Sequence, residues 1–349
     1  MILQQSYSTA WESPSNIALV KYWGKFGRQY PSNPSVSFTL SEAKSTLAMK
    51  VSPADNLSCQ LEFHGKRESA FEGRILRFLE SIKDDYPWLE NAALDMSSTN
   101  SFPHSAGIAS SASAMSALAL CLVDIDMQIH HQSWIDSPDF RQKASTVARL
   151  ASGSASRSVY PLLARWGVST ISQKGSNAYA DYVGEGIHSM FRDYKNSILI
   201  LSSATKSVSS SAGHQLMEGN RFASERFKQA NENIEQLLVA MAQGDMPSFI
   251  RIVEEEALTL HALMMTSNPS YILMEPQTIE AIRAIRGFRQ EHNIPVCFTL
   301  DAGPNIHMLY PASYTNQIEP WRDAVLRPLC EEGRIIEDCV GQGPQRLSF

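Results

Sequence analysis

The stretch most informative about the fold is residues 101–114, SFPHSAGIASSASA. It leads directly into a run of Ala, Ser, Met and Leu. The run from Ser110 to Met127 predicts a helix of small residues that packs closely on a sheet and is almost wholly buried. Glycine and small side chains let backbone N–H groups converge, and the start of a helix adds unpaired donors and a positive dipole. The stretch suits a nucleotide phosphate, but a serine-rich helix cap explains these residues equally well.

Strands and helices are mixed along the rest of the chain. Alternating or β-branched runs bounded by turn residues predict strands at Val36–Leu40, Thr46–Val51, Leu57–Phe63, Val168–Ser172, Asn196–Ser202, Pro295–Leu300, Ile306–Tyr310 and Arg334–Cys339. Apolar residues at helical spacing predict helices at Phe140–Leu150, Asn220–Gln243, Met246–Met265 and Pro276–His292. Because no regular βαβ rhythm appears, the expected class is α+β. A boundary near residue 190 divides the chain into expected lobes 1–190 and 191–349.

Composition and charge narrow the function class. The 349 residues carry a formal net charge of -6, which gives no general attraction to nucleic acid or to an anionic membrane. No targeting segment opens the chain and no apolar run reaches about 18 residues, so we expect a cytoplasmic protein. The five cysteines are odd in number and widely spaced, which favours reduced thiols. The nine histidines lack the spacing of zinc ligands, so no zinc site is expected.

Two further stretches bear charged groups that could act on a ligand. Residues 16–25, NIALVKYWGK, place Lys21 and Lys25 beside aromatic residues, where their charges could meet anionic ligand groups. Isolated lysines are more often solvated on the surface, and that interpretation stays open. Near the other end of the chain, Asp301 follows an apolar run and precedes a Gly-Pro turn. Strand ends often carry catalytic residues, although an aspartate before a turn is also a common turn residue.

Taken together, in this order and spacing, these stretches resemble the GHMP kinase superfamily and, within it, the mevalonate diphosphate decarboxylase family. The family pattern Asn-Ile-Ala-x-x-Lys-Tyr-Trp-Gly-Lys matches residues 16–25, and Pro-x-Asn-x-Ser-x-Ser-x-Thr-Leu resembles residues 31–40. The family's phosphate loop resembles residues 100–112, its Ser-Gly-Ser-Ala-Cys-Arg-Ser signature resembles residues 152–158, and its Asp-Ala-Gly-Pro-Asn segment occurs at residues 301–305. The likeness extends over nearly the whole chain.

This resemblance implies a GHMP-kinase-like two-lobe fold. The N-terminal lobe is then ribosomal-protein-S5-like, the C-terminal lobe has helices on an antiparallel sheet, and the active site lies between them. The implied reaction is the ATP-dependent decarboxylation of mevalonate 5-diphosphate to isopentenyl diphosphate, through phosphorylation of the C3 hydroxyl and loss of phosphate and CO2. The implied protein is a cytoplasmic homodimer that binds phosphorylated mevalonate but neither nucleic acid nor membrane.

The resemblance also implies roles for particular residues. Asp301 is the expected base for the C3 hydroxyl, Lys21 neutralises carboxylate or phosphoryl charge, and Arg157 is a bidentate phosphate ligand. The expected substrate-binding residues are Tyr22, Lys25, Ser152, Arg157 and Ser210. The expected ligands of ATP are Asn100, Gly107, Ala109, Ser110 and Ser111, with Mg²⁺ bound at Ser110.

Departures from the family pattern leave the substrate open. They are Ala151 for Gly, Ser156 for Cys, Pro161-Leu162 for Gly-Gly, and His214 for Met. We expect Pro161-Leu162 and His214 to flank the substrate end of the site. Mevalonate 5-phosphate is therefore an alternative substrate, although Ser152 and Arg157 favour the diphosphate. Two further alternatives are a kinase that stops after C3 phosphorylation and a non-catalytic relative that binds a metabolite. The presence of Lys21, Arg157 and Asp301 argues against both.

Overall fold

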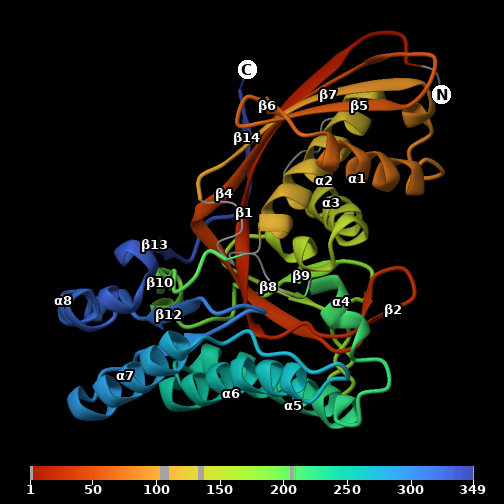
Figure 1. Ribbon diagram of the computed structural model, residues 1–349. Helices are drawn as coiled ribbons and strands as arrows, with labels where there is room; N and C mark the ends of the chain where they lie inside the picture. The colour runs from red at the N-terminus through yellow and green to blue at the C-terminus, as the bar shows by residue number, and fades with distance from the viewer. Residues whose placement is uncertain (1–2, 103–109, 133–136, 205–207, 209, 349) are drawn as a thin grey trace.

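The structure, a computed structural model, describes residues 3–102, 110–132, 137–204, 208 and 210–348. Two helix-covered sheets form two lobes, which are joined by the long strands β1 (Tyr7–Val20) and β4 (Ser35–Pro53) (Figure 1). Most strand pairs are antiparallel, and helices and strands do not alternate regularly. The expected α+β class is thus confirmed.

The first sheet has eight strands. Its main path runs in the order β14 (Gln345–Leu347), β1, β4, β7 (Ala92–Asn100), β5 (Ser58–Phe63) and β6 (Lys66–Arg67), while β8 (Leu163–Trp166) pairs with β4 and with β9 (Ala180–Tyr182). Three helices share an apolar cluster with this sheet: α1 (Ser69–Ser81), α2 (Ser110–Ile129) and α3 (Pro138–Ala151). Because β14 pairs with β1, the chain returns to the first lobe near its end.

Helix α2 lies close against this sheet, as its small residues predict. Ser13 of β1 donates a hydrogen bond to Ser116 at 2.7 Å, and the hydroxyls of Ser45 in β4 and Ser113 are also 2.7 Å apart. Larger side chains at these positions would hold the helix away from the strands. Among the described helices α2 alone is long and apolar enough to cross a membrane, but 72% of its apolar window is buried inside the protein, as in a core helix.

The second sheet is antiparallel and has the order β11 (Cys297–Thr299), β12 (Ile306–Tyr310), β10 (Lys195–Leu199) and β13 (Ile335–Cys339). Helices α6 (Met246–Met265) and α7 (Pro276–His292) contact β11, and α5 (Ala223–Gln243) packs on α6. The lobe also contains the short α4 (Ser210–Gln215) and α8 (Thr315–Val325). The predicted bounds of the helices now labelled α6 and α7 are confirmed.

A shared core joins the two lobes. The last eight residues of β1 are all buried, because α5 and α6 of the second lobe contact this strand as well as α2. The cluster that links the lobes includes Ile17, Leu19, Phe38, Ile234 and Phe249. The residues that follow β1 therefore lie where the two lobes meet.

The structure differs from the strand predictions in several places, and β7, β9 and β14 are among the strands that were not predicted. The sequence pattern does not predict β1, because Ser, Pro and Asn have low strand propensity; Pro14 is tolerated beside a register shift in the pairing with β4. The strands predicted at Val36–Leu40 and Thr46–Val51 are parts of the single strand β4. The strand predicted at Val168–Ser172 is wrong, because this segment turns after β8 around the hydroxyl of Ser169, which accepts two backbone N–H groups.

Candidate active site

Lys21 and Asp301, which are 280 positions apart in the chain, are in direct contact. Lys21 follows the last residue of β1, and Asp301 comes just after β11 at the end of a strand, as predicted. The Lys21 Nζ donates to Asp301 Oδ1 at 2.9 Å, and the two side chains are 2% and 29% exposed. The interpretation of Lys21 as a solvated surface lysine is therefore wrong. Of the two side chains, that of Asp301 is the one open to solvent.

The charge state of Lys21 is set by opposing effects. Burial lowers the pKa of its ammonium group, while the charge of Asp301 and the hydrogen bond to it raise the pKa. A further contribution that lowers the pKa comes from the charge of Arg157. The charges of Lys21, Arg157 and Asp301, the three residues predicted to be catalytic, thus influence one another. They belong to one polar cluster.

Arg157 belongs to the 3-10 helix η2 (Gly153–Val159) and is only 2% exposed. Its Nη1 donates to Ser35 at 2.6 Å, its Nη2 donates to Asn16 Oδ1 at 3.3 Å, and its Nε donates to Ser37. Burial lowers the pKa of the guanidinium to about 10, and the charge of Asp301 opposes this. The side chain stays protonated near neutral pH. These bonds use one N–H on each terminal nitrogen, and each of these nitrogens carries a second N–H.

The segment that enters β4 lines the cluster with small polar side chains. Asn33, Ser35 and Ser37 are all buried and alternate along the chain, so they share one face. Asn33 Nδ2 donates to the Lys21 carbonyl at 2.9 Å, while both serines accept from Arg157. The intervening Val36 packs into the core between the lobes. The motif noted at residues 31–40 contains these three residues, but no site role was predicted for them; the signal for a polar face is the alternation of small polar with apolar residues.

An aromatic wall borders the cluster. The ring of Tyr22 lies 4.7 Å from that of Trp166 and 4.3 Å from that of His214. The His214 Nδ1 accepts from the Gly24 N–H at 3.0 Å, and burial, aided by the charge of Lys25, lowers the pKa of His214 to about 3. His214 thus lies beside Tyr22, while its expected place at the substrate end of the site stays a prediction. By contrast, Leu162 packs into the core between the lobes.

Glycine is required at position 153 beside this wall. A Cβ atom there would lie 2.7 Å from the ring of Trp166 and 3.0 Å from that of Tyr22, which is closer than carbon atoms approach. The Ser-Gly-Ser signature therefore lets η2 approach the aromatic wall and places Arg157 beside it. Ser152, which precedes this glycine, is half-buried at the junction of α3 and η2.

The remaining predicted ligands are spread over several elements. Lys25 lies in β2 (Lys25–Phe26), which pairs with β3 (Tyr30–Pro31), and its Nζ donates to Gln29 Oε1 at 2.8 Å. Asn100 ends β7, and its Oδ1 accepts from Ser45 at 2.7 Å. Ser110 and Ser111 begin α2. Gly107, Ala109 and the side chain of Ser210 lie outside the described part of the structure.

The described residues fit a nucleotide-bound Mg²⁺ better than a metal held by protein alone. They contain no cluster of three or more His, Cys, Asp or Glu side chains that could hold a metal ion. Mg²⁺ in nucleotide sites typically keeps several waters and takes only one or two protein ligands besides the phosphates. The half-buried Ser110 at the start of α2 can supply such a hydroxyl ligand.

Two buried histidines also surround the aspartate, and sequence reasoning assigned neither a role. His261 of α6 donates from Nε2 to the Asp301 carbonyl at 3.1 Å, because a carbonyl oxygen can only accept. His307 of β12 contacts the Asn196 amide at 3.1 Å. Burial lowers the pKa of His307 to about 4, although the charge of Asp301 opposes this. His307 is therefore neutral near pH 7.

Acid should destabilise the fold through His307. Its pKa is about 4 when folded and 6.5 in the reference state, so below pH 6.5 the unfolded chain takes up a proton that the folded chain does not. Between pH 7 and pH 5 we expect this residue to lower the free energy of unfolding by about 2 kcal/mol. Urea denaturation of the wild type and of His307→Gln at both pH values measures this. The prediction fails if both proteins show the same pH dependence.

A separate groove lies away from this polar cluster. A groove of about 1100 Å³ runs between α6 and α7, where Arg286 and Arg289 form ion pairs with Glu254. None of the predicted site residues lines it. The candidate site thus rests on the polar cluster at the junction of the lobes.

Comparison with known proteins agrees with the resemblance noted in the sequence. Residues 13–180 match the family model of the diphosphomevalonate decarboxylase-like N-terminal domain, and residues 197–333 match that of the mevalonate 5-diphosphate decarboxylase C-terminal domain. The diphosphomevalonate decarboxylase of Gibberella zeae is 29% identical over 385 residues, which cover 97% of this chain and 96% of that enzyme.

Solved structures show the same fold. Mevalonate diphosphate decarboxylase from Staphylococcus aureus has a TM-score of 0.84 and 26% identity, with 100% of both chains covered. A complex of MDDEF with MVAPP, AMPPCP and magnesium has a TM-score of 0.83 and 23% identity, and covers 99% of this chain and 100% of that one. The two-lobe arrangement is therefore that of these enzymes.

Proposed function

The chain belongs to the diphosphomevalonate decarboxylase family, and on that premise we propose that it decarboxylates mevalonate 5-diphosphate to isopentenyl diphosphate with consumption of ATP. The observation that carries the proposal is the contact of Lys21 with Asp301 at 2.9 Å, beside the buried Arg157. A cation, an aligned carboxylate and a Gly/Ser-rich loop are the minimal set for phosphoryl transfer, which needs mainly positioning and charge stabilisation.

The chemistry explains why ATP is needed. The C3 hydroxyl of the substrate is a poor leaving group, and phosphorylation by ATP converts it into a phosphate ester. The C–O bond then breaks as phosphate departs, the carboxylate carbon leaves as CO2, and its bonding electrons form the alkene. The products are ADP, phosphate, CO2 and isopentenyl diphosphate.

In our proposal, the acidic and basic groups of the cluster have separate roles in this reaction. The partly exposed carboxylate of Asp301 accepts or orients the proton of the C3 hydroxyl, a kind of catalysis worth about a hundred- to ten-thousand-fold in rate. Lys21, held behind it, neutralises charge on the substrate carboxylate or the transferring phosphoryl group. The Lys21–Asp301 contact supports both roles.

The substrate's phosphate end is assigned to the other polar residues. In the proposal Arg157 offers its two remaining terminal N–H groups as a fork, and Tyr22, Lys25, Ser152 and Ser210 add donors around it. On the ATP side, the start of α2 with Ser110 and Ser111 binds the phosphates together with Asn100, Gly107 and Ala109, and Ser110 ligates Mg²⁺. The ion would neutralise negative charge on the phosphates.

Arg157→Lys is expected to raise the KM for the phosphorylated substrate roughly tenfold while changing kcat less, because lysine cannot offer the fork. Steady-state kinetics with varied mevalonate 5-diphosphate measures both constants. The matched control is Arg165→Lys, since Arg165 is also largely buried but pairs with Asp181 on β9. An unchanged KM in Arg157→Lys would remove this residue from the substrate site.

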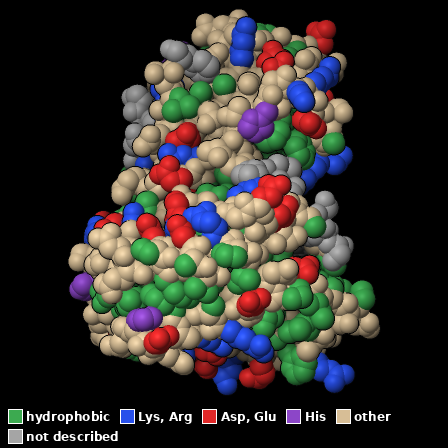
Figure 2. All heavy atoms as spheres, turned by 60° about the vertical axis from the view of Figure 1, so that its left-hand side comes forward, with side chains coloured by type: hydrophobic (Ala, Val, Ile, Leu, Met, Phe, Trp, Pro, Cys, Tyr) green, Lys and Arg blue, Asp and Glu red, His purple; other side chains and the backbone are tan. Residues whose placement is uncertain are grey.

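The localisation and assembly of the protein are also proposals. A reducing cytoplasmic location is supported by the five cysteines, all of which have free thiols. The expected homodimer rests on the family resemblance, and apolar side chains gather over the lower lobe on the face shown in Figure 2. Light scattering after size-exclusion chromatography tests the oligomeric state.

One experiment separates this function from its alternatives. ADP formation and CO2 release are measured with mevalonate, its 5-phosphate and its 5-diphosphate, and the products are identified by mass. The proposal predicts equal amounts of ADP and CO2, with the diphosphate turned over fastest. Preference for the 5-phosphate would identify a phosphomevalonate decarboxylase, ADP without CO2 would identify a kinase, and binding without turnover would identify a non-catalytic relative.

A further inference from the structure

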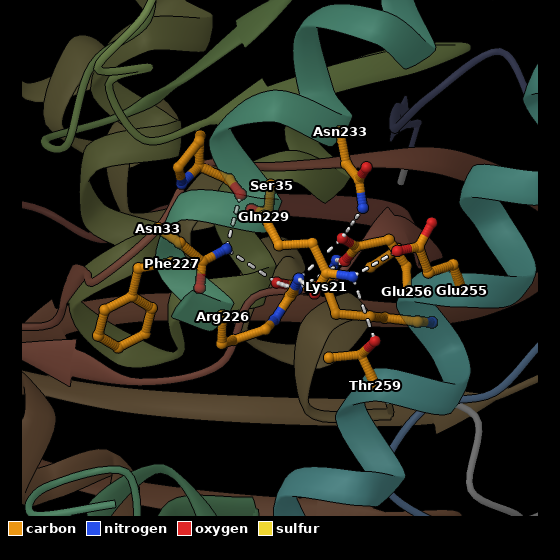
Figure 3. A network of polar contacts seen from close by, with 12 residues as sticks. Lys21, Asn33, Ser35, Arg226, Phe227, Gln229, Asn233, Glu255, Glu256 and Thr259 are labelled. Carbon is orange, nitrogen blue, oxygen red and sulfur yellow. Dashed lines mark hydrogen bonds and ion pairs between the residues drawn. The ribbon is translucent and has the colours of Figure 1, made fainter. Parts of the chain in front are cut away.

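A buried ion pair lies directly behind the active site. Arg226 of α5 and Glu256 of α6 are 2% and 0% exposed, and they face each other across the two helices (Figure 3). Arg226 Nη1 donates to Glu256 Oε1 at 2.7 Å, and Nη2 donates to Oε2 at 2.6 Å. Asn233 of α5 adds a hydrogen bond to the same Oε1 at 2.7 Å. Two side chains of α5 therefore fix the carboxylate of Glu256.

Both peptide groups of Lys21 are bound to this pair. The Lys21 N–H donates to Glu256 Oε2 at 2.8 Å, and its carbonyl accepts from Arg226 Nη2 at 3.0 Å and from Asn33 at 2.9 Å. Strand β1 ends at Val20, so Lys21 has left the sheet and its backbone needs other partners. Side chains from the second lobe thus supply two of these three backbone partners for the residue whose ammonium meets Asp301 (Figure 3).

The buried polar network around Arg226 and Glu256 is an inefficient way to stabilise the fold. Desolvation of a buried ion pair can cancel its attraction, and apolar residues of similar volume often serve the fold as well or better. Two buried polar atoms of this network, Arg226 Nε and Asn33 Oδ1, have no hydrogen-bond partner among the described residues. An incompletely satisfied polar network costs further stability. Its geometry is instead suited to holding one backbone position.

We propose that Arg226 and Glu256 are positioning residues of the active site, which fix the peptide of Lys21 so that its ammonium lies against Asp301. The inference rests on the proposed function for its catalytic consequence. A displacement of a catalytic group by about 1 Å can cost about a hundredfold in rate. Because these residues belong to the second lobe and Lys21 to the first, the pair also aligns the two halves of the site.

The chain contains a matched control two residues earlier on the same helix. Glu254 is 4% exposed and forms ion pairs with Arg286 and Arg289 of α7, away from Lys21. Glu256→Gln weakens one buried ion pair, and Glu254→Gln weakens two ion pairs of another buried carboxylate on the same helix. The double variant Arg226→Met with Glu256→Met removes both partners of the Arg226–Glu256 ion pair at once. We expect it to restore much of the lost stability but not the contacts with Lys21.

The test compares kinetics, melting temperature and acylation of Lys21 by an amine-reactive acetyl ester, followed by mass spectrometry. We expect Glu256→Gln to lower kcat by about tenfold or more at little change in the KM for ATP, and to speed acylation of Lys21. Glu254→Gln should lower the melting temperature while keeping kcat within about twofold. The double variant should regain melting temperature but keep the low kcat and the rapid acylation.

Acylation of Lys21 decides the positioning inference independently of the reaction. If Lys21 is acylated no faster in Glu256→Gln and in the double variant than in the wild type, the pair is only structural and the inference is overturned. Recovery of kcat together with melting temperature in the double variant would overturn it as well. A wild type that converts no mevalonate derivative would refute the proposed function, while faster acylation in these variants would still support the positioning of Lys21.

Discussion

Asp301→Asn is expected to lower kcat for ADP formation by about a hundred- to ten-thousand-fold. The amide keeps the size of the side chain but cannot accept the proton of the C3 hydroxyl. It also removes the negative charge that meets the Lys21 ammonium at 2.9 Å. Because the altered group is part of the chemistry rather than the phosphate sites, binding of substrate and of an ATP analogue should change little. Single-turnover kinetics and calorimetric titration measure the two effects separately.

The fold and turnover of this variant must be compared with those of a control variant that loses a carboxylate outside the site. Asp323→Asn is suitable, because Asp323 also accepts from basic side chains, Arg322 and Arg327, but lies on α8. Removing this exposed carboxylate should leave turnover unchanged. Wild-type turnover in Asp301→Asn, or an equal loss in both variants, would exclude Asp301 as the base.

The longer helices α2, α3, α5, α6 and α7 could be predicted because their local patterns agree with their tertiary surroundings, whereas α1 and α8 are missing from the predictions. Helices α6 and α7 have apolar stripes, Pro in the first turn, and bounds that the sequence predicts. Strand β1 could not be predicted in this way, since eight of its residues are buried by contacts from both lobes. Within it, the side chain of Ser13 bonds to α2 and that of Asn16 to Arg157, which no local pattern reveals.

Site residues could be predicted where the type of side chain indicates its chemical role. They could not be predicted where only folding brings a residue from far along the chain to the site. Sequence motifs pointed to Lys21, Arg157 and Asp301, and the structure brings these three into one electrostatic cluster. Nothing local in the sequence indicates that Glu256 binds the Lys21 N–H, because 235 positions separate them. Glutamate on a helix is ordinarily solvated, and only the packing of α5 on α6 makes this one buried.

Lys21→Met is expected to lower kcat by about a hundred- to a thousandfold, the usual effect of removing one preorganised electrostatic group. The methionine side chain fills similar space, and replacing a buried ammonium with an apolar group need not unfold the protein. The partly exposed Asp301 can take water in place of its lost partner. Rapid-quench measurement of ATP cleavage, with melting temperature measured in parallel, separates loss of chemistry from loss of fold.

Lys25→Met is the matched comparison, because both lysines belong to the same Lys-Tyr-Trp-Gly-Lys stretch. Lys25 is half-buried in β2 and its Nζ contacts Gln29 rather than Asp301. Its loss should therefore raise the KM of the phosphorylated substrate and leave kcat within about threefold of the wild type. If both variants lose kcat equally, the contact with Asp301 does not distinguish the two lysines, and Lys21 acts only as part of a general positive field around the phosphates.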